Sequence, residues 1–190
     1  MPNKTTLIQL IRKYLLLFAA VITVPLFAGS ATAQTRDHLT DAETDLIRFH
    51  QELDKRIEVF IKAIDRRFEI INGVADPKVK KVMKGEPDWG NAPKGTHAEL
   101  IGDIAGILDE AITNIDDVSR RDEKNPLIAR SLRRLTAAAT NYVTQLTALS
   151  KQTKHDDELG AIEQALTNAN DIIEVGSKLP PPTNDKKSKP

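Results

Sequence analysis

The stretch that decides the fold covers residues 125–149 and reads NPLIARSLRRLTAAATNYVTQLTAL. An asparagine followed by a proline is a typical helix start, because the asparagine caps the first turn and proline fits its first position. Apolar residues then recur at alternating steps of four and three: Ile128, Leu132, Leu135, Ala139, Tyr142, Leu146 and Leu149. This spacing lines one helix face and is the rhythm of left-handed bundle packing. The stretch therefore predicts a long amphipathic helix inside a helical bundle.

Three further segments carry the same helical spacing. The sequences TDAE at 40–43 and THAE at 96–99 both have the form of a capping box, which opens a helix. The apolar stripe after the first box continues to residue 71 and predicts one unbroken helix. A second stripe covers 100–118 and a third covers 159–176. No segment alternates as a strand does, so we expect an all-α protein built as an up-and-down antiparallel four-helix bundle.

The first 33 residues have the three parts of a secretory signal peptide. A positively charged start precedes an apolar run at 15–28, and Ala31-Thr32-Ala33 supplies the small residues of a cleavage site. Such an apolar run makes a helix of roughly 21 Å, too short for a hydrocarbon core of about 30 Å. We therefore expect Sec-type export, cleavage after Ala33, and a periplasmic or secreted protein with no stable membrane anchor.

The mature chain then divides into a polar lead-in at 34–39, a helical bundle domain at 40–176 and a tail at 177–190. The tail has too few apolar residues to bury, so we expect it to be disordered. Removing the three basic residues of the signal from the chain's 27 leaves 24 against 27 acidic residues, a net charge of −3. Such a charge does not favour nucleic acid as a partner, since that requires a concentrated basic surface.

Catalytic and cofactor motifs are missing from the sequence. The chain has no cysteine, which excludes thiol catalysis, Cys-ligated zinc, iron–sulfur clusters and covalently attached c-type haem. None of the four histidines follows a carboxylate by three residues, as a di-iron bundle requires, and no two are spaced four apart. Adjacent acidic residues on a helix point in different directions, so they do not form an acid–base pair. We expect neither an enzyme nor a metal or other cofactor.

The long first connection, residues 73–95, holds the candidate partner-binding residues. An Asp-Pro pair at 76–77 and a glycine at 85 favour a short extra helix at 78–84. The densest basic patch without interspersed acids consists of Lys78, Lys80, Lys81 and Lys84, with Lys94 nearby. It can contact an anionic lipid headgroup or an acidic partner, or simply keep an exposed loop soluble. Trp89, the only tryptophan, either plugs the end of the bundle or serves as an exposed anchor for a partner.

The segment DWGNAPKGTHAELI at 88–101, with NIDD at 114–117, resembles exported bacterial helical-bundle proteins of unassigned function. The resemblance implies a helical domain over most of 40–175 and supplies no catalytic residues. Two functions stay open. The first is a non-catalytic periplasmic protein that binds a protein or a cell-envelope component through the loop at 74–95. The alternative is a carrier of a small apolar ligand or lipid, in a cavity between Phe60, Ile64, Leu108 and Leu135.

Overall fold

A computed structural model describes residues 36–74 and 87–180 of the chain. These residues form five helices and no strand, so the predicted all-α class is confirmed. The helices are α2 (Asp41–Phe49), α3 (Leu53–Ile71), α4 (His97–Arg121), α5 (Pro126–Ser150) and α6 (Asp156–Ser177). The expected signal peptide, the expected short helix at 78–84 and the tail beyond residue 180 lie outside the described residues. None of the described helices has both the length and the apolar character needed to cross a bilayer.

The prediction of one unbroken first helix was wrong. His50 and Glu52 have extended backbone angles and separate α2 from α3. The break lets α2 fold back along α3, so that Glu43 reaches Arg67 at 3.0 Å. In a continuous helix these two residues would be about 36 Å apart along the axis. Phe49 belongs to the apolar stripe that follows the first capping box, and the prediction that it is buried was wrong: it is 76% exposed at the end of α2.

Both capping boxes that the sequence predicted are present. The Thr40 hydroxyl accepts from the Glu43 N–H, and the Glu43 carboxylate accepts from the Thr40 N–H. Thr96 and Glu99 make the same reciprocal pair at the start of α4. Each box satisfies two backbone donors that the first turn of a helix leaves free, which fixes where α2 and α4 begin.

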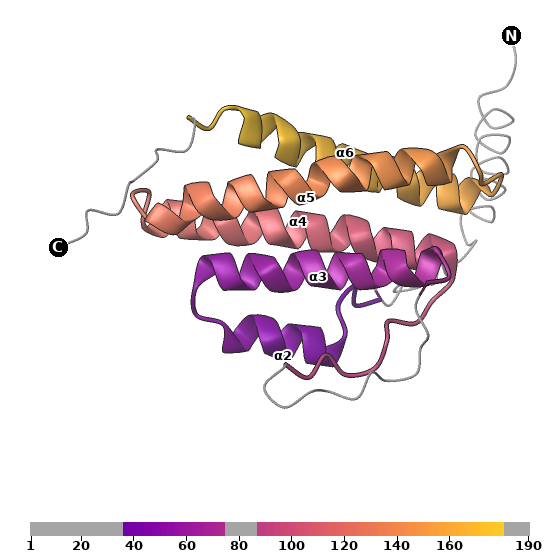
Figure 1. Ribbon diagram of the computed structural model, residues 1–190, viewed down its shortest axis with the longest axis horizontal. Helices are drawn as coiled ribbons and strands as arrows, with labels where there is room; N and C mark the ends of the chain where they lie inside the picture. Colours follow the sequence, from indigo (N-terminus) through magenta and orange to yellow (C-terminus); the bar gives the residue numbers. More distant parts are fainter. Residues whose placement is uncertain (1–35, 75–86, 181–190) are drawn as a thin grey trace, which may run out of the picture. The chain divides into compact units, whose positions relative to one another are not determined.

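The four long helices pack together (Figure 1), and buried residues from all four form one core cluster. α3 packs against α4 and α5, α6 packs against the same two helices, and α2 packs on α3. The middle of the α5 stripe is buried as predicted, from Leu132 to Leu146, while Ile128 and Leu149 pack at its edges. The buried residues of α6 are Ile162, Ala165, Ala169 and Ile172.

Contacts between side chains define the direction in which neighbouring helices run. Asp54 and Asp65 of α3 meet Arg130 and Tyr142 of α5, so residue numbers rise together and the two helices are parallel. α5 and α6 run in opposite directions: Arg133 donates to the Pro180 carbonyl, and a Cβ at Gly176 would clash with Thr136, three residues after Arg133. α3 and α5 are thus parallel neighbours that have the whole of α4 between them in the sequence.

Candidate functional site

A buried ion-pair network joins α2, α3 and α4 around Arg67. The Arg67 side chain is 1% exposed, and its two terminal nitrogens each lie 3.0 Å from one oxygen of Glu43, which is fully buried. The same nitrogens also donate to the carbonyls of Ala63 and His38, at 2.7 and 2.5 Å. Its Nε lies 3.6 Å from the Asp103 carboxylate of α4. A buried guanidinium requires such pairing, because leaving its charge without partners costs several kcal/mol or more.

A second arginine connects this network to the loop before α4. Arg66 donates to the Glu43 carboxylate at 2.6 Å and to the Asn91 carbonyl at 2.7 Å. Its guanidinium carbon lies 5.6 Å from the centre of the Trp89 ring, within the range of a cation–π contact. Gly90 lies close to Ala42 at the start of α2, where a Cβ would come within 2.7 Å. The loop at 89–91 is therefore held against α2 and α3.

The lead-in before α2 holds the other end of the loop. Arg36 forms ion pairs with Asp103 at 2.9 Å and Glu99 at 3.2 Å, and it donates to the Lys94 carbonyl. Burial raises the pKa of Asp103, against the opposing effect of Arg67 and Arg36. Glu99 behaves oppositely: the Thr96 N–H that it accepts holds the pKa of its carboxyl below the usual range. We call Arg36, Glu43, Arg66, Arg67 and Asp103 the Arg67 network.

His38 extends this arrangement along α4. Its Nε2 lies 2.8 Å from a carboxylate oxygen of Glu110. This hydrogen bond raises the pKa of His38, although partial burial of the ring works in the opposite direction. The imidazole therefore takes up a proton more readily in the folded protein than in a peptide. Protonation then converts the hydrogen bond into an ion pair between the lead-in and α4.

The structure places the predicted partner-binding residues as follows. Lys78, Lys80, Lys81 and Lys84 lie outside the described residues. Trp89 is partly buried and contacts Arg66, while the Lys94 side chain is exposed and its carbonyl bonds to Arg36. Both residues thus sit on one loop, 87–96, held at two points by the Arg67 network.

Sequence reasoning missed the Arg67 network itself, although the sequence contains a signal for it. Arg67 follows Ile64 by three residues and precedes Ile71 by four, so it lies on the apolar face of its helix. Asp103 has the same relation to Leu100 and Ile107. Opposite charges on two apolar faces are expected to pair when the faces meet, since neither can be buried alone.

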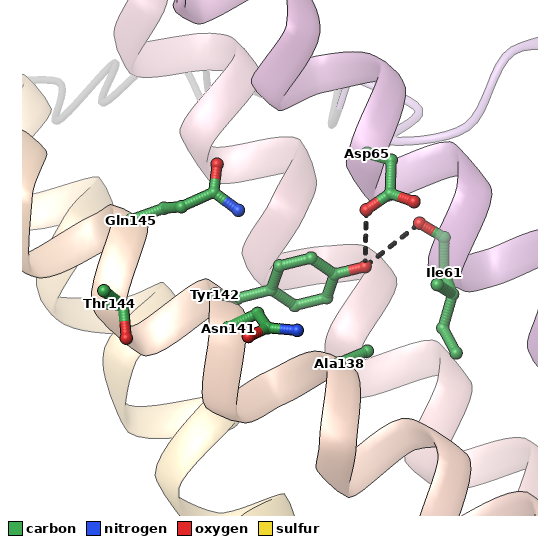
Figure 2. A pocket seen from close by; sticks show the side chains of 7 residues that line it. All are labelled: Ile61, Asp65, Ala138, Asn141, Tyr142, Thr144 and Gln145. Carbon is green, nitrogen blue, oxygen red and sulfur yellow. Dashed lines mark hydrogen bonds between the residues drawn. The ribbon is translucent and has the colours of Figure 1, made fainter.

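A groove of about 460 Å³ opens between α3 and α5 (Figure 2). The lining residues are Ile61 and Asp65 from α3, and Ala138, Asn141, Tyr142, Thr144 and Gln145 from α5. We call this the Asp65 groove. The Tyr142 ring is stacked on Phe68 at 5.4 Å, which fixes the direction of its hydroxyl.

The Tyr142 hydroxyl lies 3.0 Å from a carboxylate oxygen of Asp65 and 3.1 Å from the Ile61 carbonyl (Figure 2). Burial raises the pKa of both Asp65 and Tyr142. The phenol has one proton, so it satisfies only one of these two acceptors at a time. When Asp65 is protonated, its carboxyl donates to the phenol oxygen while the phenol donates to Ile61. When Asp65 is ionised, the phenol donates to it instead, and this hydrogen bond opposes the rise in the pKa of Asp65 that burial causes.

The four residues expected around an apolar ligand, Phe60, Ile64, Leu108 and Leu135, are fully buried within one core cluster. They do not line the Asp65 groove. In the part of the chain that the structure describes, no three His, Asp or Glu side chains are grouped to hold a metal ion. Comparison with models of protein families, with curated proteins and with solved structures found no match to this chain.

Proposed function

We propose that the protein is a non-catalytic exported helical-bundle protein that binds a protein or a cell-envelope component through the loop at 87–96. Four long helices in an up-and-down antiparallel bundle would provide the rigid scaffold, and the signal at 1–33 would direct the chain out of the cytoplasm. The observation that carries the proposal is the contact between Trp89 and Arg66. It holds a partly exposed tryptophan in place on a loop without regular structure.

Physical reasons favour this loop as a contact surface. Tryptophan and arginine are the residues most enriched at the energetic centres of protein interfaces. A loop that is already held by Arg66 and Arg36 loses little conformational freedom on binding, which improves affinity. Four lysines at 78–84 precede this loop in the sequence, so the partner surface is expected to be anionic.

The test compares the partly buried Trp89 with the exposed Phe49 on the same protein. Trp89→Ala is expected to lower binding to envelope extracts and to vesicles containing phosphatidylglycerol by tenfold or more. Phe49→Ala is the matched control, because Phe49 is 76% exposed but lies at the end of α2, away from the loop. Both variants should keep the helical circular-dichroism signal of the native protein.

Because Trp89 is the only tryptophan, its fluorescence reports directly on the loop. Binding is expected to shift its emission to shorter wavelength, since the exposed part of the ring leaves water. Separate titrations with the vesicles and with purified envelope proteins distinguish a lipid surface from a protein partner. Equal binding by the Trp89→Ala and Phe49→Ala variants would contradict the proposal.

A further inference from the structure

The Asp65 groove combines a half-buried carboxylate with open space beside it. No Lys, Arg or His of the described residues forms an ion pair with Asp65. Lys62, one turn earlier on α3, pairs with Glu69 at 3.5 Å instead. The polar contact that Asp65 does have, with Tyr142, occupies one oxygen, and the other has no hydrogen-bond partner among residues 36–74 and 87–180. Partial burial of a carboxylate without a counter-ion is unfavourable, and a cation entering the groove would relieve that cost.

The other lining residues indicate which kind of ligand the groove would fit. Asn141 and Gln145 bring side-chain amide oxygens and Thr144 brings a hydroxyl, all of which accept hydrogen bonds from N–H groups. Ile61 and Ala138 provide apolar surface. The volume of about 460 Å³ is within the range of small-molecule sites. The groove thus combines one acid, several acceptors and a short apolar wall.

We propose that the Asp65 groove binds an organic cation, a primary ammonium or guanidinium group on a short apolar stem, with Asp65 as its counter-ion. The cation donates to the free oxygen of Asp65 and to the amide oxygens, while the stem contacts Ile61 and Ala138. Tyr142 is a positioning residue, because its hydroxyl holds the other oxygen of Asp65 and its ring is fixed by Phe68.

The groups around the groove give this binding a defined pH dependence. Asp65 must be ionised to act as counter-ion, and burial raises its pKa. Affinity is therefore fully present well above that pKa and is lost as the pH falls through it. The charged groups nearest Asp65 are Lys62 and Glu69 on the same helix, and the groove residues of α5 are uncharged. Bound cation is expected to lower the pKa of Asp65, because the charge favours the ionised form.

The test uses n-butylamine and n-butylguanidine as probes, with n-butanol as the neutral molecule of similar shape. Titration followed by amide NMR should give saturable shifts at Ile61, Ala138 and Asn141 with both cations and none with butanol. Asp65→Asn should weaken cation binding tenfold or more. Asp109→Asn is the matched control, since it removes the same charge at an exposed position of α4 and should leave binding unchanged.

A second variant keeps the inference testable if Asp65→Asn perturbs the fold. Ala138→Leu retains the carboxylate but fills the groove, so it should also abolish the shifts. Equal affinity of the native and Asp65→Asn proteins, or the absence of saturable shifts with either cation, would overturn the proposal.

The cation can come from a free amine or from a basic side chain of another protein. Acetyl-Gly-Lys-Gly-amide presents the same ammonium group on a peptide, and its affinity relative to n-butylamine distinguishes the two sources. Binding of either probe supports the groove as a cation site, and binding of neither overturns it. Trp89→Ala should leave these affinities unchanged, so failure of the loop proposal and failure of the groove proposal are distinguishable.

Discussion

Two regions of α3 differ in whether their buried charges are paired. Asp65 and Arg67 are only two residues apart, yet about 200° around the helix axis separates their directions. Every charged side chain of the Arg67 network has an oppositely charged partner within the described protein. The Asp65 groove has a carboxylate with a single hydroxyl partner and open volume beside it. The Arg67 network is closed, in the sense that every charge has a partner, and its ion pairs stabilise the fold. The Asp65 groove is open, because a ligand could still supply a charged partner for its carboxylate.

The largest expected effect comes from breaking the closed region. Arg67→Ala should destabilise the protein by about 3–5 kcal/mol, because it leaves the fully buried Glu43 carboxylate with only Arg66 as a cationic partner. Urea unfolding followed by circular dichroism measures the change. The double variant Glu43→Leu/Arg67→Met should recover part of the loss, since it removes both charges together but leaves Arg66 without its carboxylate partner. A loss below about 1 kcal/mol for Arg67→Ala would show that water already solvates the network.

A smaller effect is expected in the open region. Tyr142→Phe keeps the ring stacked on Phe68 but removes the hydroxyl that holds Asp65. The expected cost is about 1 kcal/mol, typical of one hydrogen bond. The pKa of Asp65 should rise further, because the hydroxyl now acts to lower it. An NMR titration of the Asp65 carboxyl carbon measures that shift. A fall in this pKa would mean that the phenol donates its hydrogen bond to the Ile61 carbonyl and not to Asp65.

The smallest effect is expected at the edge of the closed network, where His38 meets Glu110. The pKa of His38 is raised in the folded state, so its ion pair adds stability below the unfolded value of 6.5. That contribution is lost as the pH rises through the higher folded pKa. Since the His38 side chain is 33% exposed, the difference should stay below about 1 kcal/mol. Urea midpoints measured from pH 5 to 9 should decline less in His38→Gln than in the native protein. Parallel curves would contradict the ion pair.

Much of the fold could be predicted because local rules and packing agree. The capping boxes at Thr40 and Thr96 begin helices as expected, and the alternating steps of α5 describe its buried face from Leu132 to Leu146. The break after Phe49 could not be predicted in this way, because the apolar spacing continues across it to Leu53. Tertiary ion pairing, through Glu43, decides that α2 turns back instead of continuing.

The candidate sites were harder to predict than the helices. Trp89 stood out because it is unique, but its partner Arg66 was one of many charged residues on the outer face of a long helix. Tyr142 was correctly assigned to the buried stripe of α5. Its position on that stripe gave no indication that its hydroxyl would form a hydrogen bond with Asp65. The groove depends on α3 and α5 being parallel neighbours, and helical periodicity carries no information about which helices become neighbours.

The parallel placement of α3 and α5 has a consequence for how the chain acquires its structure. Two parallel helices cannot form a local hairpin, so this pair can assemble only after α4 has been made and has crossed the length of the bundle. No fragment that ends before residue 145 contains the complete wall of the groove. The groove is thus a late product of folding, because a chain whose synthesis has not passed residue 145 cannot form it.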